Sequence, residues 1–304
     1  MKSSISLKTT ISSLSLENPF ILASGIMDED AGSMNRIIQS GAGAVVTKSI
    51  GMKERKGHPN PTFVELEHGL LNAMGLPNPG IDAYEDEVKS MKKGTGKIFG
   101  SIFGSNEDEF KVLSQSMEKY GVDAVELNLS CPHAKGYGLE IGQDPELIHS
   151  ITKTVVSSTS IPVFVKLSPN VDNICILAKA VEKSGAQGIV VINTIKAMKI
   201  NIEARQPVLA NKIGGYSGKA IKPIGIRNVY EIFENVSIPI IGVGGITTGL
   251  DVIEYLMAGA TAVQVGSAIY YGGITLFSKL QIQVENWMKE HDIAQITDLI
   301  GVAH

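Results

Sequence analysis

The sequence predicts a single-domain α/β protein folded as a (β/α)8 barrel, or TIM barrel, over residues 1–304. Eight short apolar runs recur along the chain, and most intervals between them carry helical signals. Alternating strands and helices imply a parallel sheet. The length of 304 residues, with 43% apolar and 19% charged residues, is normal for one such barrel and gives no sign of a second domain.

The eight apolar runs predict buried strands. They are rich in β-branched residues, mostly lack polar alternation, and are bounded by Gly, Pro, Asn or Ser, which is typical of strands buried on both faces. Eight units of this kind favour a closed barrel over an open sheet. The predicted strands are Pro19–Gly25, Ala44–Ser49, Ile98–Phe103, Ala124–Ser130, Val163–Ser168, Gly188–Thr194, Pro239–Gly245 and Ala262–Ala268.

Two of the intervening helices have clear end signals. Asp144 and Pro145 can cap and open a helix that runs to about Ser157. Thr248 begins a helical stretch that ends near Gly259, because glycine is a natural stop at the carboxyl end of a helix. Both helices fall between predicted strands, as the barrel requires.

Two intervals are longer than a simple crossover, and the start of the chain has a pattern of its own. Residues 51–96 and residues 195–222 exceed the usual loop length and are expected to be active-site loops. Ile5–Leu16 alternates loosely between apolar and polar residues, which predicts a small hairpin that closes the barrel bottom.

Charge and cysteine content disfavour several classes of protein. The net charge is −4 without a basic block, which disfavours nucleic-acid binding. The only cysteines, Cys131 and Cys175, are too few for a disulfide framework or for a cysteine-ligated cluster within the chain. Met1–Asn18 has no apolar signal core, and no stretch of about 20 apolar residues is present, so we expect a cytoplasmic protein without a membrane anchor.

Polar residues stand where the predicted strands end. In an α/β barrel the active site is built at the carboxyl ends of the strands, so these residues predict a catalytic barrel. They are Ser24, Lys48, Asn128, Lys166, Asn193, Gly244 and Gly245.

A glycine-rich turn predicts a phosphate site. Ile240–Gly249 is a strand followed by a glycine-rich turn and a helix start, and the next strand ends in Val265–Ser267. Glycine lets backbone amides approach an anion, and barrels often bind phosphate with the loops after strands 7 and 8. The alternative is that these glycines only make tight turns.

Lysines and asparagines near the strand ends suggest a charged, planar ligand. Lys48 and Lys166 each close an apolar strand and need an anionic partner, such as a flavin that gains negative charge on reduction. A structural ion pair with a strand-end carboxylate is the alternative. Asn72, Asn128 and Asn193 offer amides that suit planar rings, although any one of them can be a turn residue.

The two cysteines receive different interpretations. Cys131 precedes Pro132 in a loop after the fourth strand, where it is either an active-site nucleophile or base, or an inert buried thiol. Cys175 lies in a helical pattern and is expected in the core. The six histidines are scattered, and no metal-ligand spacing appears, so no metal site is expected.

Several motifs together resemble the dihydroorotate dehydrogenase family, from about Leu16 to Gly273. Two further segments, Gly142–Leu147 and Ala204–Asn211, resemble its class 1B catalytic subunits. The absence of an amino-terminal membrane segment, and a cysteine where class 2 members use a serine base, are unlike class 2. The motifs that carry the resemblance are Asn72–Asn78, Asn128–Pro132, Phe164–Pro169, Ser217–Pro223 and Gly242–Ile246.

The resemblance implies oxidation of dihydroorotate to orotate in pyrimidine biosynthesis, with FMN as cofactor and Cys131 as base. The residues implied to line FMN are Ser24, Lys48, Ser49, Asn128, Lys166 and Ile192, with Gly218, Gly244, Gly245, Gly266 and Ser267 near its phosphate. The residues implied to bind the substrate are Lys48, Asn72, Ala73, Met74, Gly75, Leu76, Asn128, His133, Asn193 and Thr194.

The resemblance also implies partners: a homodimeric core that works with a second subunit carrying FAD and an iron–sulfur cluster. Three departures from the family pattern bear on substrate affinity and on the electron acceptor. His133 stands where the family usually has a substrate-binding Asn, Ser101 stands where an Asn usually contacts the flavin, and Ile269–Gly273 differs from the usual sequence after the eighth strand.

Two alternatives to this function stay open. One is a related FMN barrel oxidoreductase that acts on another dihydropyrimidine, which the substrate carboxylate would discriminate. The other is a non-catalytic flavin-binding subunit. Cys131 and the two strand-end lysines argue against a pure binder, because binding alone needs no base.

Overall fold

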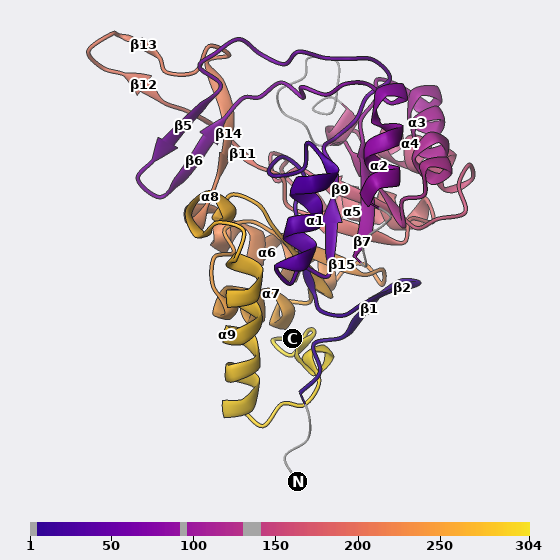
Figure 1. Cartoon of the computed structure of the whole chain (residues 1–304), viewed down its shortest axis with the longest axis vertical. Helices are drawn as coiled ribbons and strands as arrows, with labels where there is room; N and C mark the ends of the chain where they lie inside the picture. Colours follow the sequence, from indigo (N-terminus) through magenta and orange to yellow (C-terminus); the bar gives the residue numbers. More distant parts are fainter. Residues whose placement is uncertain (1–4, 92–95, 130–140) are drawn as a thin grey trace.

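A computed structural model describes residues 5–91, 96–129 and 141–304. Its centre is a closed barrel of parallel strands in the order β10-β15-β16-β3-β4-β7-β8-β9, so each strand pairs with the next barrel strand along the chain and β16 closes onto β3. This architecture confirms the predicted (β/α)8 fold (Figure 1). The barrel strands are β3 (Phe20–Leu22), β4 (Ala44–Val46), β7 (Lys97–Ile102), β8 (Ala124–Asn128), β9 (Val163–Leu167), β10 (Gly188–Val191), β15 (Ile240–Val243) and β16 (Ala262–Val265).

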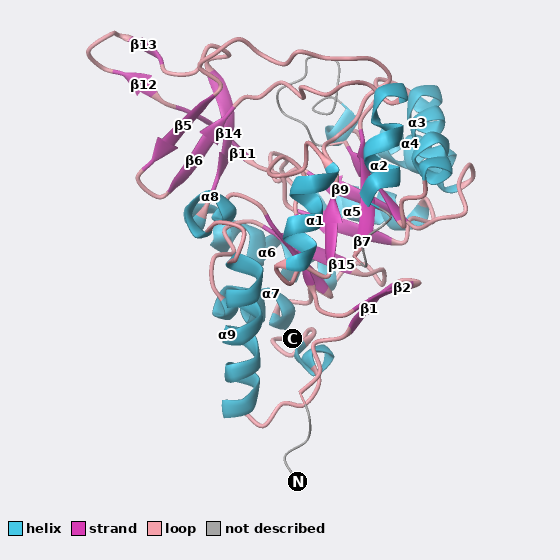
Figure 2. Cartoon of the chain, viewed as in Figure 1, coloured by secondary structure: helices cyan, strands magenta, loops and turns pink. Residues whose placement is uncertain are grey.

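Helices follow the strands and cover the barrel from outside (Figure 2). The two helices with sequence end signals are confirmed: Asp144 caps α4, and Thr248 caps α7 through a capping box with Asp251. The α-helices are α1 (Ala31–Gln39), α2 (Glu85–Met91), α3 (Glu107–Tyr120), α4 (Pro145–Val156), α5 (Ile174–Lys183), α6 (Lys222–Phe233), α7 (Gly249–Met257), α8 (Ala268–Gly272) and α9 (Leu276–Glu290). Single 3-10 turns are η1 (Asp82–Tyr84), η2 (Ile141–Gln143), η3 (Lys219–Ile221) and η4 (Ile296–Leu299).

An amino-terminal hairpin of β1 (Thr9–Ile11) and β2 (Leu14–Leu16) packs against one end of the barrel. Its side chains Ile11, Leu14 and Leu16 share one buried cluster with inward-facing residues of the barrel strands. Three of those residues, Ala44, Ala124 and Ala262, are the first residues of their strands. The hairpin therefore seals the amino-terminal end of the barrel and leaves the carboxyl end as the open mouth.

The two long intervals contain strands that the sequence did not reveal. An antiparallel sheet with the order β11-β14-β6-β5 combines strands from both intervals, and β12 and β13 form a separate hairpin. In Figure 2 this sheet stands beside the barrel mouth. Its strands are β5 (Phe63–Leu66), β6 (Gly69–Asn72), β11 (Ile195–Met198), β12 (Ile200–Asn201), β13 (Gln206–Pro207) and β14 (Ile213–Ser217).

The predicted barrel strands are present but several end earlier than expected. The fourth, for example, was expected over Ala124–Ser130, whereas β8 ends at Asn128. No helix within the described ranges combines the length and the apolar character that crossing a membrane requires.

Candidate active site

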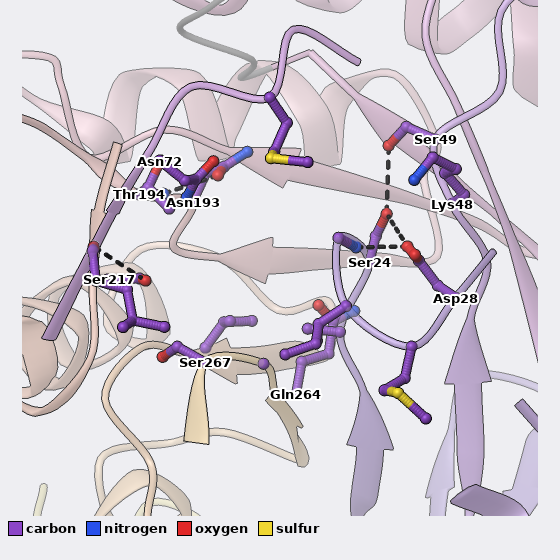
Figure 3. Close-up of a pocket in the computed structure, with 18 of the residues that line it drawn as sticks. Ser24, Asp28, Lys48, Ser49, Asn72, Asn193, Thr194, Ser217, Gln264 and Ser267 are labelled. Carbon is purple, nitrogen blue, oxygen red and sulfur yellow. Dashed lines mark hydrogen bonds between the residues drawn. The ribbon is translucent and has the colours of Figure 1, made fainter. Parts of the chain in front are cut away.

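A cavity of about 680 Å³ opens at the carboxyl ends of the barrel strands and extends to the four-stranded sheet. Figure 3 shows its two sides: Ser24, Asp28 and Lys48 face Asn72 and Asn193 across the hollow. Of the site residues predicted from sequence, those in the cavity wall are Ser24, Lys48, Ser49, Asn72, Met74, Gly75, Leu76, Asn128, Lys166, Ile192, Asn193, Thr194, Gly244, Gly245, Gly266 and Ser267.

Two predicted site residues, Ala73 and Gly218, are absent from the cavity wall, and two others are not described. Ala73 is fully buried beside Leu71 and Leu209 in a small cluster under the sheet. Gly218 supports the wall from behind, because its carbonyl oxygen lies close to Gly245. Cys131 and His133 lie outside the described residues.

The floor of the cavity holds three buried polar side chains from three strands. The Lys166 ammonium donates to Gln264 Oε1 at 3.1 Å and lies 3.5 Å from Glu126 Oε1. Gln264 Nε2 in turn donates to Glu126 Oε2 at 2.5 Å. The sequence left two interpretations of Lys166, a ligand contact or a structural ion pair with a strand carboxylate. The structure is compatible with both, because Lys166 faces the cavity and also has a strand carboxylate beside it.

Lys48 closes the opposite side of the mouth. Its ammonium pairs with Glu29 at 3.2 Å, while 16% of the Lys48 side chain and 75% of the Glu29 side chain stay accessible. Water screens the pair because Glu29 is largely exposed, so the pair is worth little to stability and leaves Lys48, which lines the cavity, available to a ligand.

A chain of hydroxyl groups connects the mouth to the barrel interior. Ser49 Oγ lies 3.4 Å from Ser24 Oγ and 2.8 Å from Ser101 Oγ, and it accepts a hydrogen bond from Asn128 Nδ2 at 3.0 Å. Ser101 is fully buried beneath Ser49. Ser101, one of the three departures from the family pattern, therefore places its hydroxyl behind the cavity wall. There it helps to orient Ser49 and, through Ser49, the Asn128 amide.

Asp28 is a buried carboxyl group in the wall. It accepts hydrogen bonds from the Gly25 amide at 2.5 Å and from Ser24 Oγ at 3.4 Å. Loss of water on burial raises the pKa of Asp28 above its ordinary value, against the opposing effects of the Gly25 amide and Lys48.

The predicted phosphate turn has the geometry of an anion cradle. Gly244 and Gly245 have φ angles of 129° and 69°, and a Cβ on Gly245 would lie 2.9 Å from the Gly218 carbonyl oxygen. Among hydrogen bonds between described residues, none uses the backbone amide of Gly244, Gly245, Gly266 or Ser267. These amides remain available to an anion at this end of the cavity.

The amide side of the cavity is partly ordered by local hydrogen bonds. Asn193 Oδ1 accepts from the Thr194 amide at 2.7 Å, and Asn72 Nδ2 lies 3.5 Å from the Gly215 carbonyl oxygen. Asn193 therefore orders its own turn and also lines the cavity, whereas Asn72 ends strand β6 and lines the cavity with its amide against the paired strand β14. At the opening, Tyr270 of the divergent Ile269–Gly273 segment lies against Phe63 with ring centres 5.5 Å apart.

Sequence reasoning missed Asp28, Glu126 and Gln264. A signal existed for the last two, because Gln264 is the one polar residue of β16 and Glu126 stands between Val125 and Leu127 inside β8. Such a residue has to face other polar groups in the barrel interior. For Asp28, which lies among other acidic residues after the first barrel strand, no local pattern separates a buried carboxylate from a solvated one.

Comparisons with known proteins agree with one another. The family model described as "Dihydroorotate dehydrogenase" matches residues 6–288. A protein of Methanocaldococcus jannaschii named "Dihydroorotate dehydrogenase B (NAD(+)), catalytic subunit" is 50% identical over 302 residues, which is 98% of each chain. A protein of the same name from Thermoplasma volcanium is 51% identical over 297 residues, with 98% of each chain covered.

A solved structure has the same fold. The ligand-free DHODH of Eimeria tenella superposes with a TM-score of 0.87 and 24% identity, over 100% of this chain and 93% of that chain.

Proposed function

The chain belongs to the dihydroorotate dehydrogenase family, and on this premise we propose that it oxidises dihydroorotate to orotate in pyrimidine biosynthesis, with FMN as its bound cofactor. One observation carries the proposal from the structure side. A single cavity at the barrel mouth unites two lysines, three asparagines and a glycine-rich anion cradle. A planar ligand with a phosphate and a second, carboxylate-bearing planar ligand match this combination of groups.

The cavity residues fit FMN in three respects. The volume of about 680 Å³ lies within the usual range for cofactor sites. The unused amides of Gly244, Gly245, Gly266 and Ser267 supply donors for a phosphate. Lys166 supplies a positive charge at the floor, and Ser24, Lys48, Ser49, Asn128 and Ile192 complete the proposed flavin wall.

The proposed substrate site lies toward the amide side of the same cavity. Asn72, Asn128 and Asn193 offer donors and acceptors to the pyrimidine ring, and Lys48 offers a cation to the substrate carboxylate. The segment from Met74 to Leu76 covers the ring, Thr194 borders it, and His133 is a further proposed contact.

The proposed chemistry divides between carbon 5 and carbon 6 of dihydroorotate. Cys131 takes the proton from carbon 5 as the general base. A bound FMN supplies the acceptor for the hydride that leaves carbon 6. Asn128 orients the ring above the floor, and the Lys166 charge stabilises the negative charge that develops there.

A separate subunit completes the proposed electron path. The relatives from Methanocaldococcus jannaschii and Thermoplasma volcanium are named catalytic subunits of an NAD(+) enzyme. We propose that this chain forms a homodimeric core, in the cytoplasm, that passes electrons to a subunit with FAD and an iron–sulfur cluster. The chain has only two cysteines, which are too few to hold such a cluster alone.

Anaerobic reduction of the purified chain tests the function. Dihydroorotate should bleach the flavin absorbance of the FMN-loaded protein, whereas dihydrouracil, which lacks the carboxylate, should not. Bleaching by dihydrouracil alone would indicate that the substrate is another dihydropyrimidine. Bleaching by neither compound would indicate a flavin-binding protein without this catalytic activity. An assay with NAD(+), with and without a co-purified partner, then identifies the acceptor.

A further inference from the structure

The cavity floor contains two polar residues, Glu126 and Gln264, that have no role in the proposed chemistry. We propose that both are positioning residues: they hold Lys166 at the floor and set the net charge that this part of the cavity offers to a bound flavin. The inference rests on the proposed function, since it takes a flavin to be the occupant of the cavity.

The hydrogen bonds among the three side chains fix their orientations in turn. A carboxylate only accepts, so Glu126 Oε2 compels the Gln264 amide to present its Nε2 group, at 2.5 Å. The other end of that amide, Oε1, must then face away from Glu126. It accepts from the Lys166 ammonium at 3.1 Å. Glu126 therefore decides which way Gln264 points, and Gln264 decides where the ammonium lies.

The arrangement spans the barrel. Glu126 is on β8 and Gln264 is on β16, which stand opposite each other in the order of the closed barrel. Lys166 is on β9, next to β8. Side chains from both sides of the barrel thus meet beneath the cavity, above the apolar interior that the amino-terminal hairpin seals. A bridge of this kind holds the ammonium more firmly than a single strand-end contact.

Burial strengthens the electrostatic interactions among Glu126, Gln264 and Lys166. The exposed fractions are 0% for Glu126, 6% for Lys166 and 1% for Gln264, so water screens the three groups poorly. The ammonium lies nearer to Gln264 Oε1, at 3.1 Å, than to Glu126 Oε1, at 3.5 Å. An ammonium has three donors, and among the described residues two acceptors engage it at the floor. The third donor remains for the cavity.

This geometry has a consequence for electron transfer. Lys166 attracts the negative charge that a flavin gains on reduction, whereas the Glu126 carboxylate, 3.5 Å from the same ammonium, repels it. The negative charge of Glu126 beside the ammonium lowers the preference of the cavity for the reduced flavin. Glu126 therefore sets the reduction potential of the flavin through Lys166 without touching the substrate.

Reduction potentials of the FMN-loaded variants, measured by anaerobic dye titration, test the inference. Glu126→Gln keeps the shape and removes the opposing charge, so the reduced flavin should gain at least about tenfold over the oxidised flavin. For a two-electron couple this corresponds to a rise of about 30 mV. Gln264→Met removes the acceptor at 3.1 Å and lets Lys166 move toward Glu126, so the potential should fall and FMN should dissociate more readily.

A matched control separates charge from stability. Asp251 is another buried carboxylate that pairs with a lysine, Lys222 at 2.8 Å, but it lies outside the cavity wall. Asp251→Asn should lower the melting temperature and leave the flavin potential unchanged. An unchanged or lowered potential in Glu126→Gln, or an unchanged potential in Gln264→Met, would overturn the inference.

Three further outcomes test the inference and separate it from the proposed function. Failure of both floor variants to fold would overturn the inference, because the three residues would then serve barrel stability. If the wild-type chain binds no FMN, the proposed function fails together with the inference. An FMN-loaded wild type that dihydroorotate bleaches, combined with unmoved potentials in the variants, overturns the inference alone.

Discussion

Burial decides how the single carboxyl group of Asp28 responds to pH. In the folded chain the loss of water raises its pKa above the ordinary value, so the unfolded chain releases this proton at a lower pH than the folded chain does. Between the two pKa values the folded state binds more protons than the unfolded state. The stability that protonated Asp28 contributes is therefore fully present below the ordinary pKa and is lost as pH rises through the folded-state pKa.

Asp28→Asn should remove this dependence, because the amide keeps an oxygen acceptor for Gly25 and cannot ionise. The free energy of unfolding, measured by urea titration between about pH 4 and pH 7, should increase for Asp28→Asn relative to wild type as the pH rises. Asp30→Asn serves as the control. Asp30 is an exposed helix cap whose pKa is lowered by its hydrogen bonds to Ser33, so its stabilising charge is already largely present at about pH 4, and the stability of Asp30→Asn relative to wild type should stay nearly constant over the same rise. Equal trends in both variants would contradict the assignment.

Cys131 carries the proton-transfer part of the proposed mechanism. Cys131→Ala should leave FMN bound and slow flavin reduction by dihydroorotate about 10²–10⁴-fold, the usual contribution of a positioned base. Cys131→Ser should fall between, because a serine hydroxyl is the weaker acid. Stopped-flow absorbance under anaerobic conditions measures both rates. Flavin reduction at the wild-type rate in Cys131→Ala would remove the residue from the role of base.

Single residues differ in how far the sequence could predict their place. Lys166 was predictable because a lysine that ends a buried strand has few alternatives to the barrel mouth. Its neighbours Glu126 and Gln264 come from opposite strands, and nothing local in either segment indicates that they meet. Ser101 shows the same limit, since its contact with Ser49 depends on the packing of two neighbouring strands.

The turn after β15 is the element on which phosphate binding depends. Gly245 has a φ of 69°, and a Cβ there would lie 2.8 Å from Lys222 Cβ and 2.9 Å from the Gly218 carbonyl oxygen. Gly245→Ala should therefore shift the turn, cost about 1 kcal/mol or more of stability, and weaken FMN binding at least about tenfold. Fluorescence titration of the flavin-free chain with FMN measures the affinity.

Gly185→Ala is the matched control for the turn. Gly185 also has a positive φ, 83°, but its Cβ would meet only Val156 at 3.6 Å, outside the cavity wall. This variant should lose about 1 kcal/mol of stability through its positive φ alone and keep the wild-type affinity for FMN. Equal FMN affinity in both variants would show that the turn does not hold the phosphate.

The strands and helices that could be predicted are those whose sequence signals lie within the element itself. The barrel strands and the caps Asp144 and Thr248 follow from runs and end residues that lie within a few positions of one another. The four-stranded sheet escaped prediction because its central pairing joins Asn72 to Gly215. Its short strands also lack a continuous apolar run, since one face carries exposed residues. Long-range antiparallel pairing leaves no period in the sequence that could indicate the partner.

The whole molecule consists of a large barrel core and a smaller packed region above it. Leu71, Ala73 and Leu209 form a buried cluster of their own under the sheet, separate from the clusters inside and around the barrel. The cavity lies between these two regions and takes wall residues from both, including Asn72 from the sheet and Asn128 from the barrel. Tyr216 packs against both the large cluster and the small one, and a ligand in the cavity adds a second link between the two regions.

This division predicts how ligands change local stability. A small cluster opens more easily than a barrel core, so amides of β6 and β14 should exchange hydrogen faster than those of β8 and β9 in the ligand-free chain. A ligand that contacts both regions stabilises the closed state by about 2.7 kcal/mol at a concentration of 100 times its Kd. Orotate added to the FMN-loaded chain should therefore slow exchange in β6 and β14. Exchange in the β1–β2 hairpin, which seals the far end of the barrel, should change least. Hydrogen exchange read by mass spectrometry compares these peptides directly, and an equal slowing of the sheet and the hairpin would mean that the ligand stabilises the molecule as one unit.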